Sequence, residues 1–384
     1  MRLIKISKYS LVVIALLSLG GSLYYLQLSN RHKAIVKTTL AHRLGLVDGS
    51  WNVTYAANQT DFITPTFVVD NIYTSMEGPK VMQGFQVNPE SEALVWIRSF
   101  RTEALATDEQ RQLSNDFICH TNVDYYDSSY YSKWDLPGRI GKHYPRLATL
   151  TNGMESYAFP EGFGFPIKAN EYLYLSTQSL NHNKKDSLFK IKHKISLSYA
   201  NDDASLKPLS SRTIFIMLPY DDDQPFKNEA AKVDPTICIP VETKNHNYLA
   251  NNGKRMSGHW VIFPGKQTYR SPVRDQLQLT DTTRLHHIAT HLHPYAESLS
   301  LKDKTTDSIL FTAQATNHLD KTGLKNITEF SSKEGLLLFP DHEYELILKT
   351  NNTTSTKQDM MASMFVALYD AQLDKKIKES RKKN

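Results

Sequence analysis

The sequence predicts an all-β protein, with two consecutive antiparallel β-sandwich (jelly-roll) domains after an N-terminal apolar helix. The chain has 384 residues, which is long enough for two domains of ordinary size. Its 20 tyrosines and 16 phenylalanines favour strands. Short runs with a period of two, such as Tyr-Leu-Tyr-Leu at residues 172–175, are separated by polar turns. With 40% hydrophobic and 22% charged residues, the composition excludes a disordered chain and a polytopic membrane protein.

The chain begins with an apolar segment. Residues 9–30 carry no charged side chain, and roughly 20 apolar residues cross a bilayer as a helix. This favours a signal anchor that binds the membrane through residues 9–30 and holds the body outside the cytoplasm. The alternative is a cleaved signal peptide, with Arg2, Lys5 and Lys8 as its charged region and Ser18-Leu19-Gly20 as a small-x-small cleavage site. In that case the protein is secreted, so both alternatives predict an extracytoplasmic location.

The first sandwich is expected over residues 46–205, after the anchor or signal peptide and a short helical linker in residues 1–45. One helix is expected to interrupt this sandwich, at residues 102–113. Its strands are expected at residues 66–69, 94–100, 118–126 and 172–180.

The second sandwich is expected over residues 206–372, and it includes a His-x-His site. A polar, proline-bearing segment at residues 221–245 precedes its main block of strands. Those strands are expected at residues 260–263, 298–301, 309–313, 343–348 and 364–369. A basic tail, residues 373–384, is interpreted as a solvated helix end.

The positive net charge of +5 is concentrated at the two ends of the chain. Residues 1–37 carry six Lys/Arg and no acid, and residues 374–384 carry six Lys/Arg against two acids. The body between them therefore has 33 basic and 38 acidic residues. A nucleic-acid-binding domain keeps its basic surface on the folded body, so nucleic acid is excluded as a partner.

The densest chemical signal is the run Arg-Leu-His-His-Ile-Ala-Thr-His-Leu-His at residues 284–293. On a strand, His291 and His293 point to the same face and present two imidazoles side by side. Two such ligands suit zinc, copper, iron or nickel, and the metal stays open on this ground. The alternative is a solvated strand face. The same alternation puts His287 on the face of His291 and His286 on the opposite face.

With the residues that follow it, Pro-Tyr-Ala-Glu-Ser-Leu, the His291-Leu-His293 strand resembles the copper type II, ascorbate-dependent monooxygenases. These are the relatives of peptidylglycine α-hydroxylating monooxygenase and dopamine β-monooxygenase. The resemblance implies that Met361 is the third ligand of this copper, with Met360 and Met364 as rivals. A thioether is a suitable ligand for Cu(I). Ala296-Glu297 stands where the family has Gly-Arg.

Two further stretches, residues 159–166 and 172–181, resemble the end of the family's first domain. The resemblance implies a second copper near His120, but Cys119 stands in its His-His pair and Gln178 stands at its later histidine. His182 lies four residues after Gln178 and is a possible substitute. Cys119 has three interpretations, which are a thiolate ligand, a disulfide partner of Cys238 and a small buried residue.

The resemblance implies an exported, membrane-anchored monooxygenase that hydroxylates an unknown small molecule or peptide with O2, copper and a reductant such as ascorbate. The alternative is a non-catalytic exported copper-binding or interaction protein on the same fold, which loss of the second copper would favour. No catalytic residue is identified. The sequence contains no Gly-x-Ser-x-Gly, His-Glu-x-x-His or Walker motif, so hydrolase, zincin and nucleotidase functions have no motif in their favour.

Overall fold

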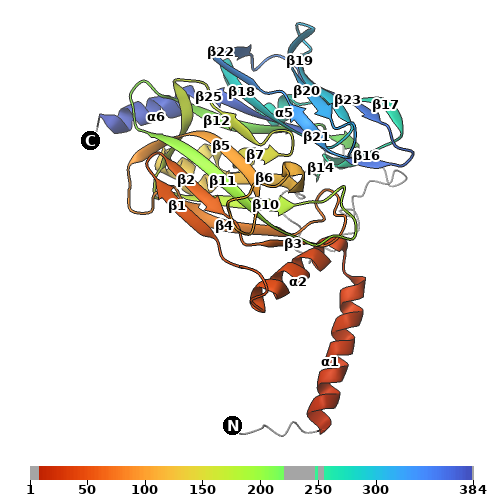
Figure 1. Cartoon of the computed structure of the whole chain (residues 1–384). Coiled ribbons are helices and arrows are strands. Elements are labelled where there is room, and N and C mark those ends of the chain that lie inside the picture. Colours follow the sequence, from red (N-terminus) through yellow and green to blue (C-terminus); the bar gives the residue numbers. More distant parts are fainter. Residues whose placement is uncertain (1–7, 220–246, 250–254, 383–384) are drawn as a thin grey trace.

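A computed structural model describes residues 8–219, 247–249 and 255–382 of the chain (Figure 1). Strands form most of its regular structure, and several sheets are packed together. The prediction of an all-β protein is confirmed.

The helices of the described residues lie mainly near the two ends of the chain. They are α1 (Lys8–Gln27), α2 (Asn30–Arg43), α3 (Asp127–Lys133), α5 (Arg274–Leu277) and α6 (Ala371–Arg381), with the 3-10 helices η1 (Asn115–Phe117) and η2 (Pro137–Arg139). The strands of the first half are β1 (Asn52–Ala56), β2 (Gln59–Ile63), β3 (Phe67–Val69), β4 (Lys80–Gln86), β5 (Leu94–Ala106), β6 (Ile118–Tyr125), β7 (Arg146–Thr151), β8 (Ser156–Ala158), β9 (Phe163–Lys168), β10 (Tyr172–Ser179) and β11 (Phe189–Asn201). Those of the second half are β12 (Lys207–Phe215), β13 (Leu218–Pro219), β14 (Asn247–Leu249), β15 (Arg255–Ser257), β16 (Trp260–Ile262), β17 (Gly265–Pro272), β18 (Thr283–Leu292), β19 (Ala296–Asp303), β20 (Ser308–Asn317), β21 (Leu324–Ile327), β22 (Phe330–Leu338), β23 (Tyr344–Asn352), β24 (Gln358–Met360) and β25 (Ala362–Tyr369).

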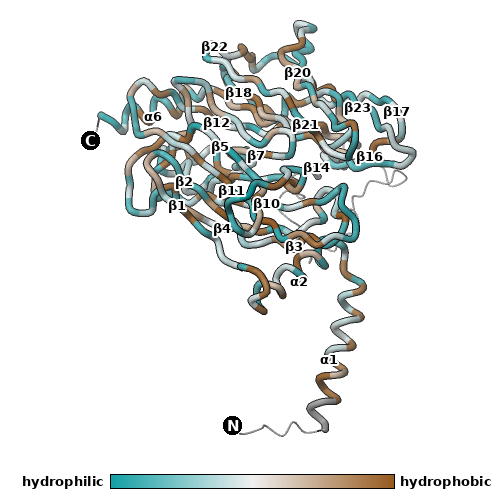
Figure 2. The backbone as a smooth tube through the Cα atoms, viewed as in Figure 1, coloured by the Kyte–Doolittle hydropathy of each residue, from teal (hydrophilic) through white to brown (hydrophobic). Residues whose placement is uncertain are grey.

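Helix α1 stands away from the β-sheet body (Figure 1). Its apolar side chains are exposed, and its apolar positions alternate with paler, less hydrophobic ones in Figure 2. Ser18, Gly20, Gly21 and Gln27 interrupt the apolar run. Within residues 8–219, 247–249 and 255–382, no helix combines the length and the apolar character needed to cross a membrane. The described residues therefore do not contain the membrane-spanning helix that the sequence predicted over residues 9–30, and attachment to a membrane stays a prediction.

The helix predicted at residues 102–113 is also wrong. Strand β5 continues through this stretch and pairs antiparallel with β11, with Thr102 opposite Ile195 and Ala106 opposite Ile191. Thr102 and Ala104 are fully buried. Pairing with a long neighbouring strand decides the conformation here, because local helix preference is weak compared with tertiary contacts.

Among the described residues, one large sheet extends through both halves of the chain. Strands β1, β2, β11, β5 and β9 lie side by side in it, and β12, β25, β18 and β22 continue it. The two parts meet where β9 and β12 run parallel, with Lys207 opposite Phe163 and Pro208 opposite Gly164. A second sheet, β4-β10-β6-β7, belongs to the first half, and a third, β17-β23-β19-β20-β21, belongs to the second half.

One hydrophobic core connects the two halves. It includes Trp96 and Phe165 from the first half and Leu299 and Leu346 from the second, all of them buried. Figure 2 shows hydrophobic residues along the strands of both halves. Side chains that lie where the halves meet are therefore shielded from water.

A turn between β3 and β4 approaches this meeting place. The Thr74 backbone N–H and hydroxyl both donate to the Glu77 carboxylate, at 3.0 and 2.6 Å, and these bonds close the turn. Met76, inside the turn, has a φ of 66°, a left-handed conformation that is costly for a side chain of this size. Gly78 lies against the backbone of β10, because a Cβ placed on it would be 1.8 Å from the Ser179 carbonyl oxygen.

We expect Gly78→Ala to destabilise the protein. The added methyl group cannot coexist with the Ser179 carbonyl, so the turn must move away from β10, and overpacking of this kind costs about 1–3 kcal/mol. The free energy of unfolding, measured by denaturant titration, tests this. Gly138→Ala is the matched control, because nothing lies within 4 Å of its added Cβ. Equal stability of the two variants would show that the turn is not packed as described.

Candidate functional site

Three imidazoles meet where the two halves of the chain join. His291 lies near the end of β18, His293 follows that strand directly, and His259 lies between β15 and β16. The ring centroids of His291 and His293 are 5.3 Å apart, and those of His259 and His293 are 5.6 Å apart. His291 and His293 are buried, at 7% and 5% exposure.

Burial keeps the imidazoles of His291 and His293 uncharged. Loss of hydration lowers the pKa of His291 to about 4, with His259 and Arg146 as further positive neighbours. Loss of hydration is also the largest cause that lowers the pKa of His293 well below 6.5, and the neighbouring His291, His259 and His182 lower it further. Both rings are therefore neutral near pH 7, and each has one nitrogen that can accept a proton.

Ser75 lies in the turn between β3 and β4 and reaches His293 from the other half of the chain. Its Oγ is 3.1 Å from His293 Nε2. The same imidazole hydrogen-bonds to the backbone of Asp359 in β24. A backbone carbonyl fixes the ring proton on the nitrogen that faces it, which leaves the other nitrogen to accept. The three residues therefore form a hydroxyl, a neutral base and a group that orients the base.

Cys119 of β6 is buried beside Ser75. Its thiol interacts with the Ser75 side chain and the Met76 backbone N–H, and it lies 3.3 Å from His120 Nδ1. Burial raises the pKa of this thiol above its usual value, in spite of those hydrogen bonds. The thiol is free, and Cys238, its predicted alternative partner in a disulfide, lies outside the described residues. A buried thiol with a raised pKa is a weak nucleophile.

The other predicted site residues lie close to these groups. Register between β18 and β25 puts Leu292 opposite Ala362, so the next residues along, His293 and Met361, lie beside each other at the end of the ladder. Gln178 opposes His120 across β10 and β6, is fully buried, and donates to the Gly78 carbonyl at 2.8 Å. His182 is near enough to His293 to lower its pKa.

His286 and His287 are buried within the protein. A β-bulge between Leu285 and His287 interrupts the alternation on which their predicted faces depended. The His286 ring stacks on Phe163 at 4.0 Å, and His287 Nε2 lies 3.2 Å from the Glu329 carboxylate. A solvated strand face, the alternative interpretation of the histidine run, does not hold for these two residues, because both rings are buried against other parts of the chain.

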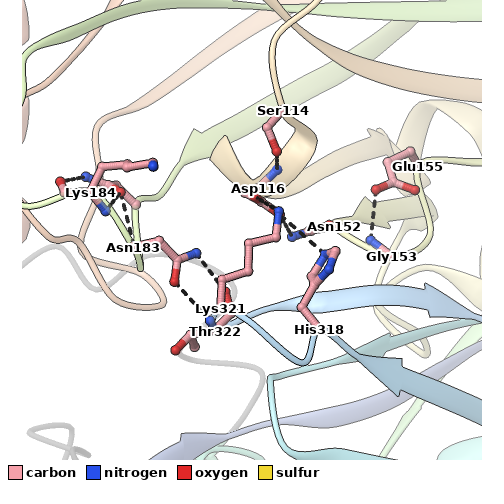
Figure 3. Close-up of polar contacts among 11 residues, drawn as sticks. Ser114, Asp116, Asn152, Gly153, Glu155, Asn183, Lys184, His318, Lys321 and Thr322 are labelled. Atoms are coloured by element: carbon pink, nitrogen blue, oxygen red, sulfur yellow. Dashed lines mark hydrogen bonds and ion pairs between the residues drawn. The ribbon is translucent and has the colours of Figure 1, made fainter.

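A second polar cluster also joins the halves (Figure 3). Lys321, from the loop between β20 and β21, forms an ion pair with Asp116 of η1, and Asn152 donates to the same carboxylate at 3.2 Å. Asn183 and Thr322 exchange two hydrogen bonds, at 2.8 and 2.9 Å. Because these contacts connect four distant segments, they hold the two halves in one arrangement around the histidines.

Comparisons with known proteins give only distant structural similarities. No family model matches the chain, and no curated protein matches it. Among solved structures, the chain is similar to the N-glycanase PNGase F, with 10% identity and a TM-score of 0.35 over 82% of this chain and 96% of that chain. A second PNGase F structure, described as a glycosylasparaginase from Flavobacterium meningosepticum, has 10% identity and a TM-score of 0.34 over the same shares of the two chains. The major capsid protein P2 of bacteriophage PM2 has 8% identity and a TM-score of 0.26, over 75% and 96%.

The resemblance to copper type II ascorbate-dependent monooxygenases is wrong. No family model, whether of that family or of another, matches the chain. Within the described residues, no three His, Cys, Asp or Glu side chains are placed to hold a metal ion. Ser75 Oγ lies 3.1 Å from His293 Nε2, so this nitrogen already has a hydrogen-bond partner. Copper hydroxylation and the copper-binding alternative are both withdrawn as functions.

The individual ligand sets are a separate matter. The first predicted copper-ligand set, His291, His293 and Met361, includes a thioether and stays a prediction. The second predicted set also stays a prediction; it consists of His120, Cys119, Gln178 and His182. Copper and ascorbate as cofactors likewise stay predictions.

Sequence reasoning did not find Ser75, His259 or Asp359. Ser75 lies in a short turn without a motif and is 218 residues from His293 along the chain. A left-handed Met76 is not visible in a sequence. The only available signal was the pair of histidines itself, which needs a proton donor once it is buried and neutral.

We expect the protein to lose stability as the pH falls from 6.5 towards 4. His291 titrates at about 4 in the folded state and near 6.5 when unfolded, so the unfolded chain binds more protons in this window. A buried histidine of this kind removes up to about 1.4 kcal/mol per pH unit. The free energy of unfolding of His291→Gln should therefore fall less steeply with acid than that of the wild type. His32→Gln, which removes an exposed imidazole, should keep the wild-type slope, and equal slopes in all three proteins would contradict the burial described here.

Proposed function

We propose that the protein is a hydrolase that acts on an ester or amide through Ser75, with His293 as general base and the Asp359 backbone as the group that orients it. The observation that carries this proposal is the 3.1 Å contact between Ser75 Oγ and His293 Nε2. An activated serine needs a base within hydrogen-bond reach and a third group that holds the base in place. All three are present, and Ser75 itself is half-buried, so a substrate can reach it.

The reaction that this arrangement supports is acyl transfer. Ser75 Oγ attacks the acyl carbon while its proton passes to His293 Nε2, and the same proton then goes to the departing alcohol or amine. Water, deprotonated in turn by His293, releases the acid and restores the serine. Because burial keeps His293 neutral, Nε2 is free of a proton at the start of the cycle.

The developing oxyanion has a donor beside the nucleophile. The Met76 backbone N–H, next in the chain after Ser75, is hydrogen-bonded to the Cys119 sulfur. Sulfur is a weak acceptor, so a charged oxygen on the acyl group would replace it readily. The left-handed Met76 directs this N–H, and backbone strain of this kind is often found at functional sites.

Cys119 is a poorer candidate for the nucleophile. Its pKa is raised by burial, which keeps it in the unreactive thiol form near pH 7. Ser75 does not depend on ionisation in advance, since His293 removes its proton during the attack. The Cys119 thiol contributes instead by packing below the turn and accepting from Met76.

The wider proposal concerns architecture and location. The two halves are proposed to be jelly-roll sandwiches over residues 46–205 and 206–372, with the site at their junction. A small molecule or peptide with a neutral acyl group is the proposed substrate, because burial keeps His291 and His293 uncharged near pH 7. Export is proposed from the basic and apolar composition of residues 1–30.

We expect a fluorophosphonate probe to label Ser75, because such probes react with serines that have a neighbouring base. Peptide mass spectrometry after labelling of the full chain should place the adduct on Ser75. Ser75→Ala should carry no adduct, and His293→Gln should be labelled at least about 100-fold more slowly, which is a typical loss on removal of a general base.

Ser29→Ala is the matched control for this experiment. Ser29 Oγ lies 2.8 Å from His32 Nδ1 at the start of α2, so it is a serine–histidine contact on an exposed helix end. Its removal should leave labelling at the wild-type rate. An unlabelled wild type, or equal labelling of the wild type and Ser75→Ala, would refute the hydrolase function.

A further inference from the structure

A second cluster, away from Ser75 and His293, contains a guanidinium whose charge is not balanced. Arg212 lies on β12, close to the tyrosines of β6 and α3 and to Arg139 of η2. Its Nη1 donates to the Ser211 carbonyl at 2.9 Å. Its Nε is fully buried and has no hydrogen-bond partner within the described parts of the chain. Buried polar groups are nearly always paired, so this nitrogen requires an explanation.

Among the described residues, Asp370 is the acid whose charge acts on Arg212, and it already has other partners. Asp370 accepts from Arg139, with Arg139 Nη2 at 3.0 Å from Oδ1, and it also caps α6 by accepting from the Leu373 backbone N–H at 2.9 Å. Asp370 therefore pairs with the Arg139 guanidinium, and no ion pair between Asp370 and Arg212 is present in the described part of the chain. Arg139 and Lys142 add positive charge nearby, and Asp127 and Glu171 are the other acids that face the tyrosines. Glu171 is itself paired with Lys133, at 3.3 Å.

Other arginines of this protein show what the Nε edge of the side chain binds. Arg146 holds Asp124 with Nε and Nη2, at 2.7 and 3.1 Å to the two carboxylate oxygens. Arg381 binds the Asp202 carboxylate with the same two nitrogens. This side-on geometry matches the two oxygens of a carboxylate or phosphate. Within the described residues, no acid lies on the corresponding edge of Arg212, and its Nε has no hydrogen-bond partner there.

Tyrosine hydroxyls complete the cluster. Tyr125 and Tyr131 share one hydrogen bond, with their hydroxyl oxygens 3.2 Å apart, so one of the two protons remains for another acceptor. The Tyr130 ring packs against both, with centroids at 5.0 and 5.3 Å, and its buried hydroxyl has no partner among the described residues. Burial raises the pKa of Tyr125 and Tyr130 well above 10, so both hydroxyls keep their protons and can donate.

We propose that Arg212, with the Tyr125–Tyr131 hydroxyl pair, forms a binding site for an oxyanion, namely the carboxylate or phosphate group of a small ligand. The unpaired Nε and the surplus positive charge both call for a negative group. Arg212 is itself half-buried, which gives such a group a path from solvent. Because the site uses residues of β6, α3 and β12, a bound anion would connect the two halves of the chain.

Isothermal titration of the full chain with acetate and, separately, with inorganic phosphate tests this site, with sodium chloride holding the ionic strength constant. The wild type should show saturable binding of one anion per chain for at least one of the two. Arg212→Met should raise the Kd at least about tenfold, because it removes a charged hydrogen-bond donor. Tyr131→Phe should raise the Kd about threefold to tenfold, because it removes a neutral donor. Acetate and phosphate as separate arms distinguish a carboxylate ligand from a phosphate ligand.

Arg274→Met is the matched control, because it removes an exposed arginine that pairs with Glu343. It should bind as the wild type does. In a buffer that contains neither acetate nor phosphate, Arg212→Met should also melt at a higher Tm than the wild type, since it removes an uncompensated buried charge. Where Arg212→Met does not fold, Arg212→Lys and Tyr131→Phe supply the comparison. Absence of saturable binding, equal binding of chloride, or the same loss in Arg274→Met would overturn the proposal.

Discussion

The hydrogen bond between Ser75 and His293 forms in a setting from which water is largely excluded, and the rest of the candidate site follows from that constraint. An imidazole in such a place cannot readily hold a charge, so burial lowers the pKa of His293 and of its neighbour His291. A neutral imidazole must find a donor for one nitrogen and an acceptor for the other. Ser75 and the Asp359 backbone meet these two needs from opposite halves of the chain.

The site therefore exists only while the two halves keep their arrangement. The parallel contact between β9 and β12 continues one sheet across the junction. The Asp116–Lys321 ion pair and the paired hydrogen bonds of Asn183 and Thr322 fasten the loop between β20 and β21 to the first half (Figure 3). These contacts are polar and partly exposed, whereas the shared core is apolar, so the core supplies most of the stability and the polar contacts fix the register.

The all-β class could be predicted from the sequence because residues alternate with a period of two along strands such as β10. This alternation can be recognised without knowing which strands lie beside them. The prediction failed at residues 102–106, where pairing with β11 decides the conformation. His291 and His293 could be recognised as a pair, since they lie two apart on one strand. Ser75 could not, because its role depends on a turn held by Glu77 and on a strand that begins about 200 residues later. The copper interpretation treated the two imidazoles as free ligands, whereas in the structure Ser75 takes the accepting nitrogen of His293.

The most direct test of the account is the protonation state of His293, measured by nitrogen-15 NMR on the histidine-labelled protein and assigned with His293→Gln. The account predicts a neutral imidazole with its proton on Nδ1 and an unprotonated Nε2, unchanged as the pH is lowered from 7.5 through 6.5. A ring that titrates near 6.5, or that carries its proton on Nε2 at neutral pH, would contradict it.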